Sequence, residues 1–465
     1  MSVRRVLRAA SLPRRVATMA LVLIMPGCDD SSSRAPGTAP SGSAPAPAPL
    51  SAPSAVGPLP SAPPPAPARA RPPTATPVPD ASEQRARLVW YPADRVQSPI
   101  TARVAASLRE IAARDPSLRA DVFAKLGDSI TASADFLYCF SRRHRLHHVD
   151  LGERGDLAPT LEFFRRGDAG GRDPFFRESR AAAVGWSAWK LLRGAPTPLE
   201  VELHRTRARF ALVMYGTNDL EAQNPQGYAR DLFEVVDVLT RRGTIPLLSS
   251  IPPRLDKPSR DTWVPRYNAI VRGVAMRRAV PFVDYHRALE SVPRHGLTKF
   301  GIHPSTYAGR LGFDACDLRA AGLEHGYNVR NLVSLDALDR ARRALEADAA
   351  LDPEPPAPPG QRSERVPLEI GALPFVDAPE PSEQGTFYAL ELPRARRVHV
   401  LAVSPGARPS TVRVSTAERS GAPLSVAGGG AVLSLDAGRH VLEVRVGGQV
   451  GDLLLIVSDA PTWSK

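Results

Sequence analysis

Residues 121–130, DVFAKLGDSI, decide the fold of the central part of this 465-residue chain. Residues 122–126 form an apolar run of strand length, and the run ends abruptly at Gly127, Asp128 and Ser129. Small residues at this point suit a tight turn from a strand into a helix. Such a turn would expose the hydroxyl of Ser129 at the carboxyl end of a strand, where open α/β sheets place their functional sites.

Two later stretches carry residue types that suit the same site. Residues 210–214 form a second apolar strand that leads into YGTND at residues 215–219, and GIHP follows much later at residues 301–304. A nucleophilic serine needs a base within hydrogen-bond reach and donors aimed at the developing oxyanion. Ser129 is the candidate nucleophile, His303 the candidate base, and the side-chain amide of Asn218 a candidate donor.

The order of these blocks resembles that of the SGNH (GDSL-type) hydrolases, with a serine first, then Gly-x-Asn-Asp, then a late histidine. The resemblance implies hydrolysis of a carboxylic ester through an acyl-serine intermediate, without a metal or another cofactor. It also implies a backbone glycine N–H as a further oxyanion donor, for which Gly185 in the stretch AVGW is the best match. The backbone N–H of Ser129 itself would complete the oxyanion hole.

One expected residue of the resembling family is absent. Family members carry an aspartate three positions before the histidine, and here that position is Phe300. Two substitutes remain open: a backbone carbonyl of residues 298–301, or the carboxylate of Asp314. The carbonyl is favoured because it requires no special folding of the segment after His303. Asp284 follows a predicted strand, so we expect a structural role for it.

Apolar runs and helix-like stretches alternate between residues 86 and 350. Buried parallel strands are predicted at residues 122–126, 210–214, 245–250 and 280–283, with helices within 220–242 and 268–278. This alternation predicts a parallel sheet covered by helices on both faces, and the resemblance implies the flavodoxin-like three-layer form. Residues 141–185 break the rhythm, which predicts an insertion over the site or along one sheet edge.

The C-terminal part has a different pattern. A Pro-rich linker at residues 351–364 precedes a region, residues 365–465, in which the hydrophobic period changes to two. Short strands at residues 386–392, 397–403, 411–414, 431–435, 440–446 and 452–457 predict a β-sandwich. This region loosely resembles bacterial pre-peptidase C-terminal domains, which implies an accessory module without catalytic residues.

The N-terminal part predicts export and anchoring. Residues 1–28 combine an Arg-rich leader with an apolar core at residues 16–25 and end at Gly27-Cys28, which resembles a bacterial lipobox. Lipidation of Cys28 would anchor the protein in the cell envelope; the alternative is an ordinary secretory signal, exported by either the Sec or the Tat route. Residues 29–85 are so rich in Pro, Ala and Ser that we expect a disordered tether, which can reach on the order of 150 Å.

Cysteine and charge usage set further expectations. The chain has 3 cysteines, so lipidation of Cys28 leaves Cys139 and Cys316 to form a disulfide in an oxidising compartment. Both cysteines lie shortly after a candidate catalytic residue, which would bring them close if those residues meet. The formal net charge is +12, but no nucleic-acid motif accompanies it, so nucleic acid is not an expected partner. His144, His147 and His148 lack acidic or cysteine partners, and no metal site is expected.

The predicted substrate is an ester on an acylated polysaccharide, a cell-wall sugar or a lipid, because an anchor and a long tether favour an extracytoplasmic polymer. An acyltransferase could use the same residues with a sugar instead of water as the acceptor. A non-catalytic binding protein built on a decayed hydrolase is a further alternative. The presence of Ser129, Asn218 and His303 argues against decay, whereas the absent acid before His303 argues for it.

Overall fold

The computed structural model describes residues 89–143, 149–309, 312–347, 349–379, 385–404, 411–416, 424–426, 430–447 and 453–459. Contacts divide the chain into the units Met1–Thr76 and Pro77–Lys465, and every described residue belongs to the second unit. The predicted leader with Cys28, the predicted tether at residues 29–85, and His144, His147 and His148 lie outside the described residues. No described helix is long and apolar enough to cross a membrane.

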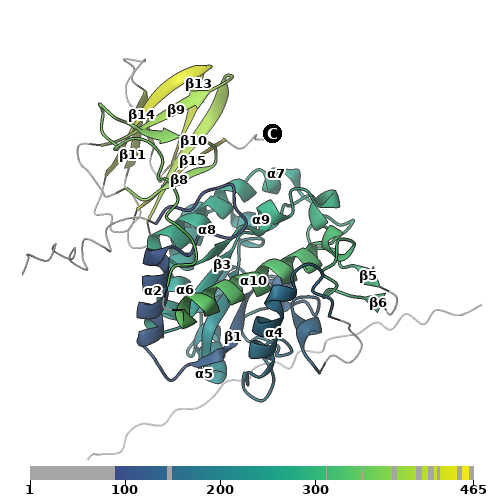
Figure 1. The fold of residues 1–465 in the computed structure, drawn as a ribbon. Coiled ribbons are helices and arrows are strands. Elements are labelled where there is room, and N and C mark those ends of the chain that lie inside the picture. Colours follow the sequence, from purple (N-terminus) through teal and green to yellow (C-terminus); the bar gives the residue numbers. More distant parts are fainter. Residues whose placement is uncertain are drawn as a thin grey trace, which may run out of the picture. The chain divides into compact units, whose positions relative to one another are not determined.

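A parallel sheet forms the centre of the α/β region, as the alternation of apolar runs predicts (Figure 1). The strand order is β1-β2-β3-β4, and the strands are β1 Arg119–Gly127, β2 Ala208–Met214, β3 Ile245–Ser249 and β4 Phe282–Val283. All of β2 is buried, and so are the last six residues of β1. Uninterrupted burial is expected of parallel strands that are covered on both faces.

A further short stretch lies along the free edge of β1. Ala182 forms an isolated parallel bridge with Gly127. The N–H of Gly127 donates to the Ala181 carbonyl at 3.0 Å, and the Ala183 N–H donates to the Gly127 carbonyl at 3.3 Å. This stretch, second along the sequence, therefore lies beside the first strand, as in a flavodoxin-like order. The end of the predicted insertion thus runs along the sheet edge.

Helices cover both faces of this sheet. One layer contains α2 Ala102–Ala113, α4 Ala158–Arg165 and α10 Gly326–Glu346, and the other contains α5 Pro198–Thr206, α6 Pro225–Arg241 and α8 Val264–Arg278 (Figure 1). Short helices α3 Ser129–Ala132, α7 Pro258–Asp261 and α9 Tyr285–Ala288, and the small hairpin of β5 Ala308–Gly309 and β6 Gly312–Phe313, lie in the connections. The fold class predicted from the sequence is confirmed.

Local sequence explains where the long helices begin. The side chain of Thr197 accepts from the Glu200 N–H, and the Glu200 carboxylate accepts from the Thr197 N–H, which forms a capping box at the start of α5. Asn224 caps α6 by accepting from the Gly227 N–H, and a proline follows at the first helical position. Helix α6 buries an apolar stripe that includes Leu232, Val236 and Leu239, which is the spacing seen in the sequence.

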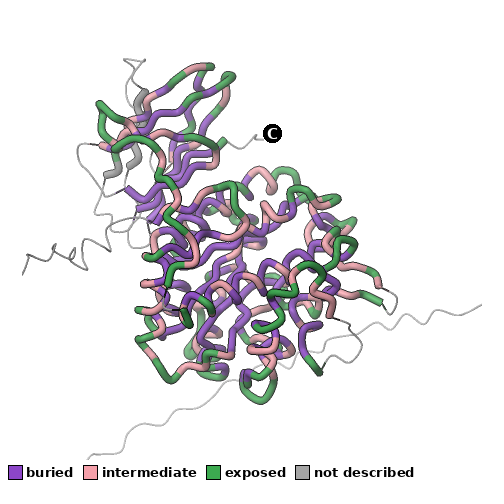
Figure 2. The backbone as a smooth tube through the Cα atoms, in the orientation of Figure 1, coloured by how far each residue is buried: buried purple, intermediate pink, exposed green. Residues whose placement is uncertain are grey.

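The core follows the inner faces of the sheet and helices, as the buried colour in Figure 2 shows. Phe123 of β1 packs edge-on against Phe164 and Phe175, with ring centroids 5.3 and 5.2 Å away. Lys125 is the exception within this apolar strand. Its ammonium donates to the Phe175 carbonyl at 3.0 Å and lies 3.8 Å from the ring centroid of Tyr138. Burial lowers the pKa of Lys125 to about 7.

The C-terminal region forms two antiparallel-rich sheets, in the orders β13-β10-β15-β8 and β12-β11-β14-β9-β7. The predicted strands appear as β9 Thr386–Leu392, β10 Arg396–Val403, β11 Thr411–Thr416, β13 Gly430–Leu435, β14 Gly438–Gly447 and β15 Leu454–Asp459. Three shorter strands were not predicted: β7 Leu368–Ile370, β8 Phe375–Asp377 and β12 Leu424–Val426. Buried residues of both sheets, such as Leu390 and Val400, share one apolar cluster, so the region is a β-sandwich.

Candidate active site

Ser129 lies at the first position of helix α3, directly after strand β1. The turn is tight because a Cβ on Gly127 would lie 2.1 Å from the Thr131 hydroxyl oxygen and 2.7 Å from the Met214 carbonyl oxygen. Only glycine fits that space. Asp128 caps the short helix, since its Oδ1 accepts from the Ile130 N–H at 2.9 Å. These contacts hold the serine at the carboxyl end of the central sheet.

His303 reaches this serine from a loop far along the chain. Its Nε2 lies 2.9 Å from Ser129 Oγ, although the residues are 174 positions apart. The loop folds back on itself, because the Thr298 N–H donates to the His303 carbonyl and the Gly301 N–H donates to the Thr298 carbonyl, both at 2.9 Å. The structure therefore places the two residues as a nucleophile and its base require.

A disulfide joins the segments that follow these two residues. Cys139 and Cys316 are bonded, with their Cα atoms 5.7 Å apart and a sequence separation of 177. Asn331 of α10 lies beside this bridge and donates to the carbonyls of Asp135 and Ala315 at 2.9 and 3.0 Å. The bridge and the amide together connect the segment after Ser129 with the segment after His303.

Asn218 follows strand β2 and contacts the turn that contains Gly185. Its side-chain amide donates one hydrogen bond to the Trp186 carbonyl at 3.0 Å, which leaves its second N–H for another acceptor. Gly185 is exposed and has a φ of +73°, a conformation that favours glycine. Within the described residues, the N–H groups of Gly185 and Ser129 form no hydrogen bond. Since Ala182 pairs with Gly127, this turn lies near the strand end that carries Ser129.

In the described part of the chain, no carboxylate forms a hydrogen bond with the His303 ring. The only side-chain hydrogen bond of the His303 ring there is the one to Ser129, so the favoured carbonyl partner is not observed either. Asp314 Oδ1 instead accepts from the Cys316 N–H at 3.2 Å. Asp284 Oδ1 accepts from Ser250 Oγ at 2.9 Å and from the Arg287 N–H at 3.1 Å, a structural arrangement as expected.

Comparison with known families agrees with this geometry. Residues 125–310 match the GDSL-like Lipase/Acylhydrolase family, and the matched range includes Ser129, Gly185, Asn218 and His303. The chain carries a GDSL-like lipase/acylhydrolase domain. It is therefore a carboxylic ester hydrolase, as the order of the sequence blocks indicates. A comparison with curated proteins finds no match.

Several solved structures are similar to parts of this chain at low sequence identity. A GDSL-like lipase from Bacteroides thetaiotaomicron VPI-5482 has 16% identity and a TM-score of 0.31, and the match covers 51% of this chain and 99% of that chain. An acetylxylan esterase from Geobacillus stearothermophilus has 14% identity and a TM-score of 0.30, with coverages of 46% and 93%. A two-domain esterase active on acetylated mannans has 12% identity and a TM-score of 0.31, with coverages of 77% and 95%.

Two buried carboxylates of the GDSL-like domain lie beside the candidate residues. Burial raises the pKa of Asp128, whereas the Ile130 N–H, the Arg330 guanidinium, the Thr217 hydroxyl and His303 act in the opposite direction. Asp219 is 6% exposed, and its two oxygens accept from the Ala188 N–H at 3.1 and 3.3 Å. Burial raises the pKa of Asp219 to about 7. Asp219 thus ties the end of the Gly185 turn to the Asn218 loop.

Arg254 also organises the GDSL-like domain, and the sequence analysis did not identify it. Its guanidinium is buried and donates to the Thr217 carbonyl at 2.7 Å, to Asp256 at 2.8 Å and to Glu221 at 3.0 Å. The Asp256 N–H in turn donates to the Gly301 carbonyl at 3.2 Å. Arg254 therefore connects the loop of Asn218 with the loop of His303. Nothing in its sequence neighbourhood signals this role.

Exposed aromatic side chains lie close in sequence to the candidate residues of the domain. Trp189 is 44% exposed, and the cationic groups of Lys190 and Arg193 lie 5.9 and 5.8 Å from its ring centroid. Phe300 is 71% exposed, with the Lys299 ammonium 5.2 Å from its ring centroid. These distances are within the range of cation–π contacts.

Proposed function

We propose that this GDSL-type esterase is an envelope-anchored serine enzyme in which Ser129 is the nucleophile and His303 is the general base. The observation that carries the proposal is the 2.9 Å approach of Ser129 Oγ to His303 Nε2. A hydroxyl at this distance can transfer its proton to a neutral imidazole as it attacks. Asn218 and the N–H groups of Gly185 and Ser129 are the proposed oxyanion donors.

The reaction proceeds in two halves. Ser129 Oγ attacks the ester carbonyl while its proton moves to His303 Nε2, and the carbonyl oxygen becomes a tetrahedral oxyanion. His303 then returns the proton to the departing alcohol, which leaves an acyl-serine. Water attacks this ester with His303 again as the base, and release of the carboxylic acid restores the serine hydroxyl. Each oxyanion donor of this type contributes about 3–4 kcal/mol to transition-state stabilisation.

A dyad of Ser129 and His303 must orient its imidazole without the aspartate of a serine triad. An aspartate in a serine triad orients the imidazole and stabilises its charged form, and its loss costs up to about 10⁴ in rate where the wrong tautomer results. Here the loop carrying His303 is fixed by its own hydrogen bonds, by Arg254 through Asp256, and by the Cys139–Cys316 bridge. The loop architecture is proposed to orient the ring, because in the described residues the Asp314 carboxylate accepts from the Cys316 N–H and not from His303.

The proposed substrate is an O-acyl ester on an extracytoplasmic polymer, such as an acylated polysaccharide or cell-wall glycan, or on a lipid. The leader that ends at Cys28 supports a lipid anchor, and the Pro-rich residues 29–85 support a long tether. An enzyme on such a tether can reach material well away from its own membrane. Fractionation tests the anchor: a Cys28→Ala protein should leave the membrane fraction or accumulate unprocessed, whereas unchanged fractionation contradicts anchoring.

The catalytic proposal is tested by hydrolysis of p-nitrophenyl acetate with the full chain. Ser129→Ala and His303→Ala should each reduce activity to near background. Ser133→Ala is the matched control, because Ser133 lies one turn later and its hydroxyl bonds Asp135 at 3.3 Å rather than His303. Wild-type activity in folded Ser129→Ala protein would contradict the proposed nucleophile.

A further inference from the structure

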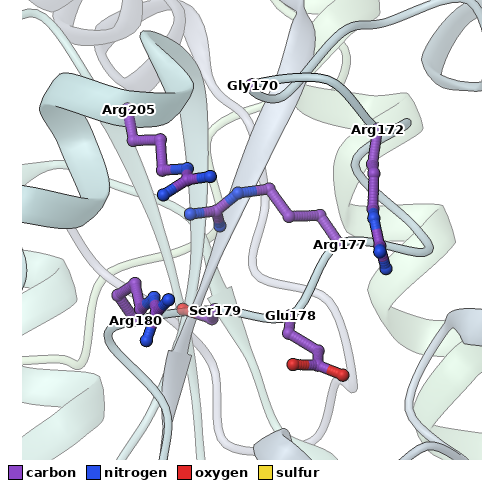
Figure 3. A pocket seen from close by; sticks show the side chains of 7 residues that line it. All are labelled: Gly170, Arg172, Arg177, Glu178, Ser179, Arg180 and Arg205. Atoms are coloured by element: carbon purple, nitrogen blue, oxygen red, sulfur yellow. The ribbon is translucent and has the colours of Figure 1, made fainter.

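A polar cavity lies away from Ser129, beside helix α5. Its volume is about 290 Å³, and its wall contains Arg172, Arg177, Ser179, Arg180, Arg205 and Glu178. Arg177 and Arg205 extend toward each other from opposite sides of this cavity, and Glu178 points away from both (Figure 3). We call this cavity the arginine pocket. Its lining contains four guanidinium groups and one carboxylate, so it carries excess positive charge.

One wall of the arginine pocket is rigid. Glu202 of α5 is fully buried, and both of its oxygens accept from the guanidinium of Arg177, one of them at 2.8 Å. The same carboxylate accepts from the backbone N–H of Arg180 at 2.9 Å. Glu202 therefore compensates the charge of Arg177 and fixes the backbone between Arg177 and Arg180 in one position. This preorganised wall needs no rearrangement to receive a ligand.

The other three guanidinium groups have no such compensation. Within the described ranges, no carboxylate lies at ion-pair distance from the side chains of Arg172, Arg180 or Arg205. Arg172 instead lies over the ring of Phe176, 5.4 Å from its centroid. The loop of Gly170 approaches Arg205 so closely that an added Cβ would lie 3.1 Å from the Arg205 carbonyl oxygen. Three uncompensated cations around one cavity favour an anionic occupant.

The chemistry of the lining identifies the class of ligand. Guanidinium groups present paired N–H donors that match the oxygens of a carboxylate, sulfate or phosphate. Ser179 adds a hydroxyl to the wall. The cavity is larger than one small anion requires, so it has room for part of the molecule that carries the anionic group.

The same segment connects the arginine pocket to the site of Ser129. Arg180 is followed directly by Ala181–Ala183, which pair with Gly127, and then by Gly185. At about 3.3 Å per residue along an extended chain, Arg180 of the pocket and Gly185 of the proposed oxyanion hole are separated by a path on the order of 15 Å. We propose, on the basis of the esterase function proposed above, that the pocket is a subsite for an acidic group of a polymeric substrate. The substrate class is therefore an acidic, acylated glycan.

The test compares Arg172→Ala/Arg205→Ala with a matched double variant, Arg230→Ala/Arg241→Ala, in the full chain. The control removes the same charge from helix α6, where both side chains are more than half exposed. Titration calorimetry uses three probes: an oligouronate, a neutral oligosaccharide of the same length, and inorganic sulfate. Kinetics use p-nitrophenyl acetate and a partially O-acetylated oligouronate.

We expect the pocket variant, which lacks two guanidinium groups, to bind the oligouronate at least tenfold more weakly than wild type, a decrease that the loss of a single charged contact is enough to cause. Its KM for the acetylated oligouronate should rise by a similar factor, while hydrolysis of p-nitrophenyl acetate stays within twofold and the control matches wild type. The subsite proposal would be overturned if wild type bound the acidic and neutral oligosaccharides equally. It would also be overturned if wild type bound inorganic sulfate but not the oligouronate. If wild type itself does not hydrolyse p-nitrophenyl acetate, the proposed esterase mechanism fails instead.

Discussion

Replacing Asp219 by asparagine should change how the stability of the protein depends on pH. Asp219 is buried, and its only described side-chain hydrogen bonds come from the Ala188 N–H. An asparagine keeps an oxygen for that N–H and removes the charge. Because burial raises the pKa of Asp219 from 3.8 to about 7, the folded state disfavours the carboxylate form.

Proton linkage gives the direction in which the stability changes with pH. Well below pH 3.8 the carboxyl is protonated in both the folded and the unfolded state, so Asp219 does not lower the stability there. Between pH 4 and 7 the folded state retains a proton that the unfolded state has lost, so stability falls as pH rises. Above pH 7 both states are ionised and the full cost is present. A shift from 3.8 to about 7 corresponds to about 4 kcal/mol as an upper figure.

Urea unfolding at pH 4 to 8.5 measures this effect in wild type, Asp219→Asn and an exposed control, Asp94→Asn. The advantage of Asp219→Asn over wild type should grow between pH 4 and 7 and then become constant. Asp128, whose pKa burial also raises, is present in all three proteins, and its charge adds to the effect of burial on the pKa of Asp219. Parallel curves for wild type and Asp219→Asn would refute the assigned burial cost.

Three further predictions concern the site and its support. Asn218→Ala should lower kcat on a simple ester by about 10²–10³ through loss of one oxyanion donor, and an unchanged kcat would remove Asn218 from that role. Replacing Cys139 and Cys316 by alanine together should lower the free energy of unfolding by about 3–5 kcal/mol, because the bridge closes a span of 177 positions; an unchanged urea midpoint would contradict this. Asp314→Ala should leave kcat within a few-fold if the dyad operates without it, whereas a loss of several orders of magnitude in folded protein would identify Asp314 as the missing acid.

The sequence predicted the elements whose pattern is local. Strand β2 was predicted at residues 210–214 and spans Ala208–Met214, because a parallel strand buried on both faces reads as a continuous apolar run. Strand β9 was predicted with its observed bounds, since its buried and more exposed residues alternate except at Ala389, which is also buried. Strands β7, β8 and β12 have three residues each, too few for any period to be recognised.

The site residues, too, could be predicted only where a local sequence pattern marks them. Ser129, Asn218 and His303 could be proposed because each lies in a recognisable block, and the structure brings Ser129 and His303 into contact. Arg254 could not, because its partners lie on separate loops that meet only in the folded chain. The exposure of Trp189 could not be predicted either, because it depends on the course of the turn after Gly185.

The central claim is that Ser129 is an activated nucleophile, and covalent labelling with a fluorophosphonate tests it most directly. The full chain is treated with the reagent, digested and mapped by mass spectrometry. The account predicts a single adduct on Ser129, no adduct in Ser129→Ala, much slower labelling in His303→Ala and unchanged labelling in Ser133→Ala. An enzymatically active protein that shows no adduct on Ser129, or that labels equally fast without His303, would contradict the account.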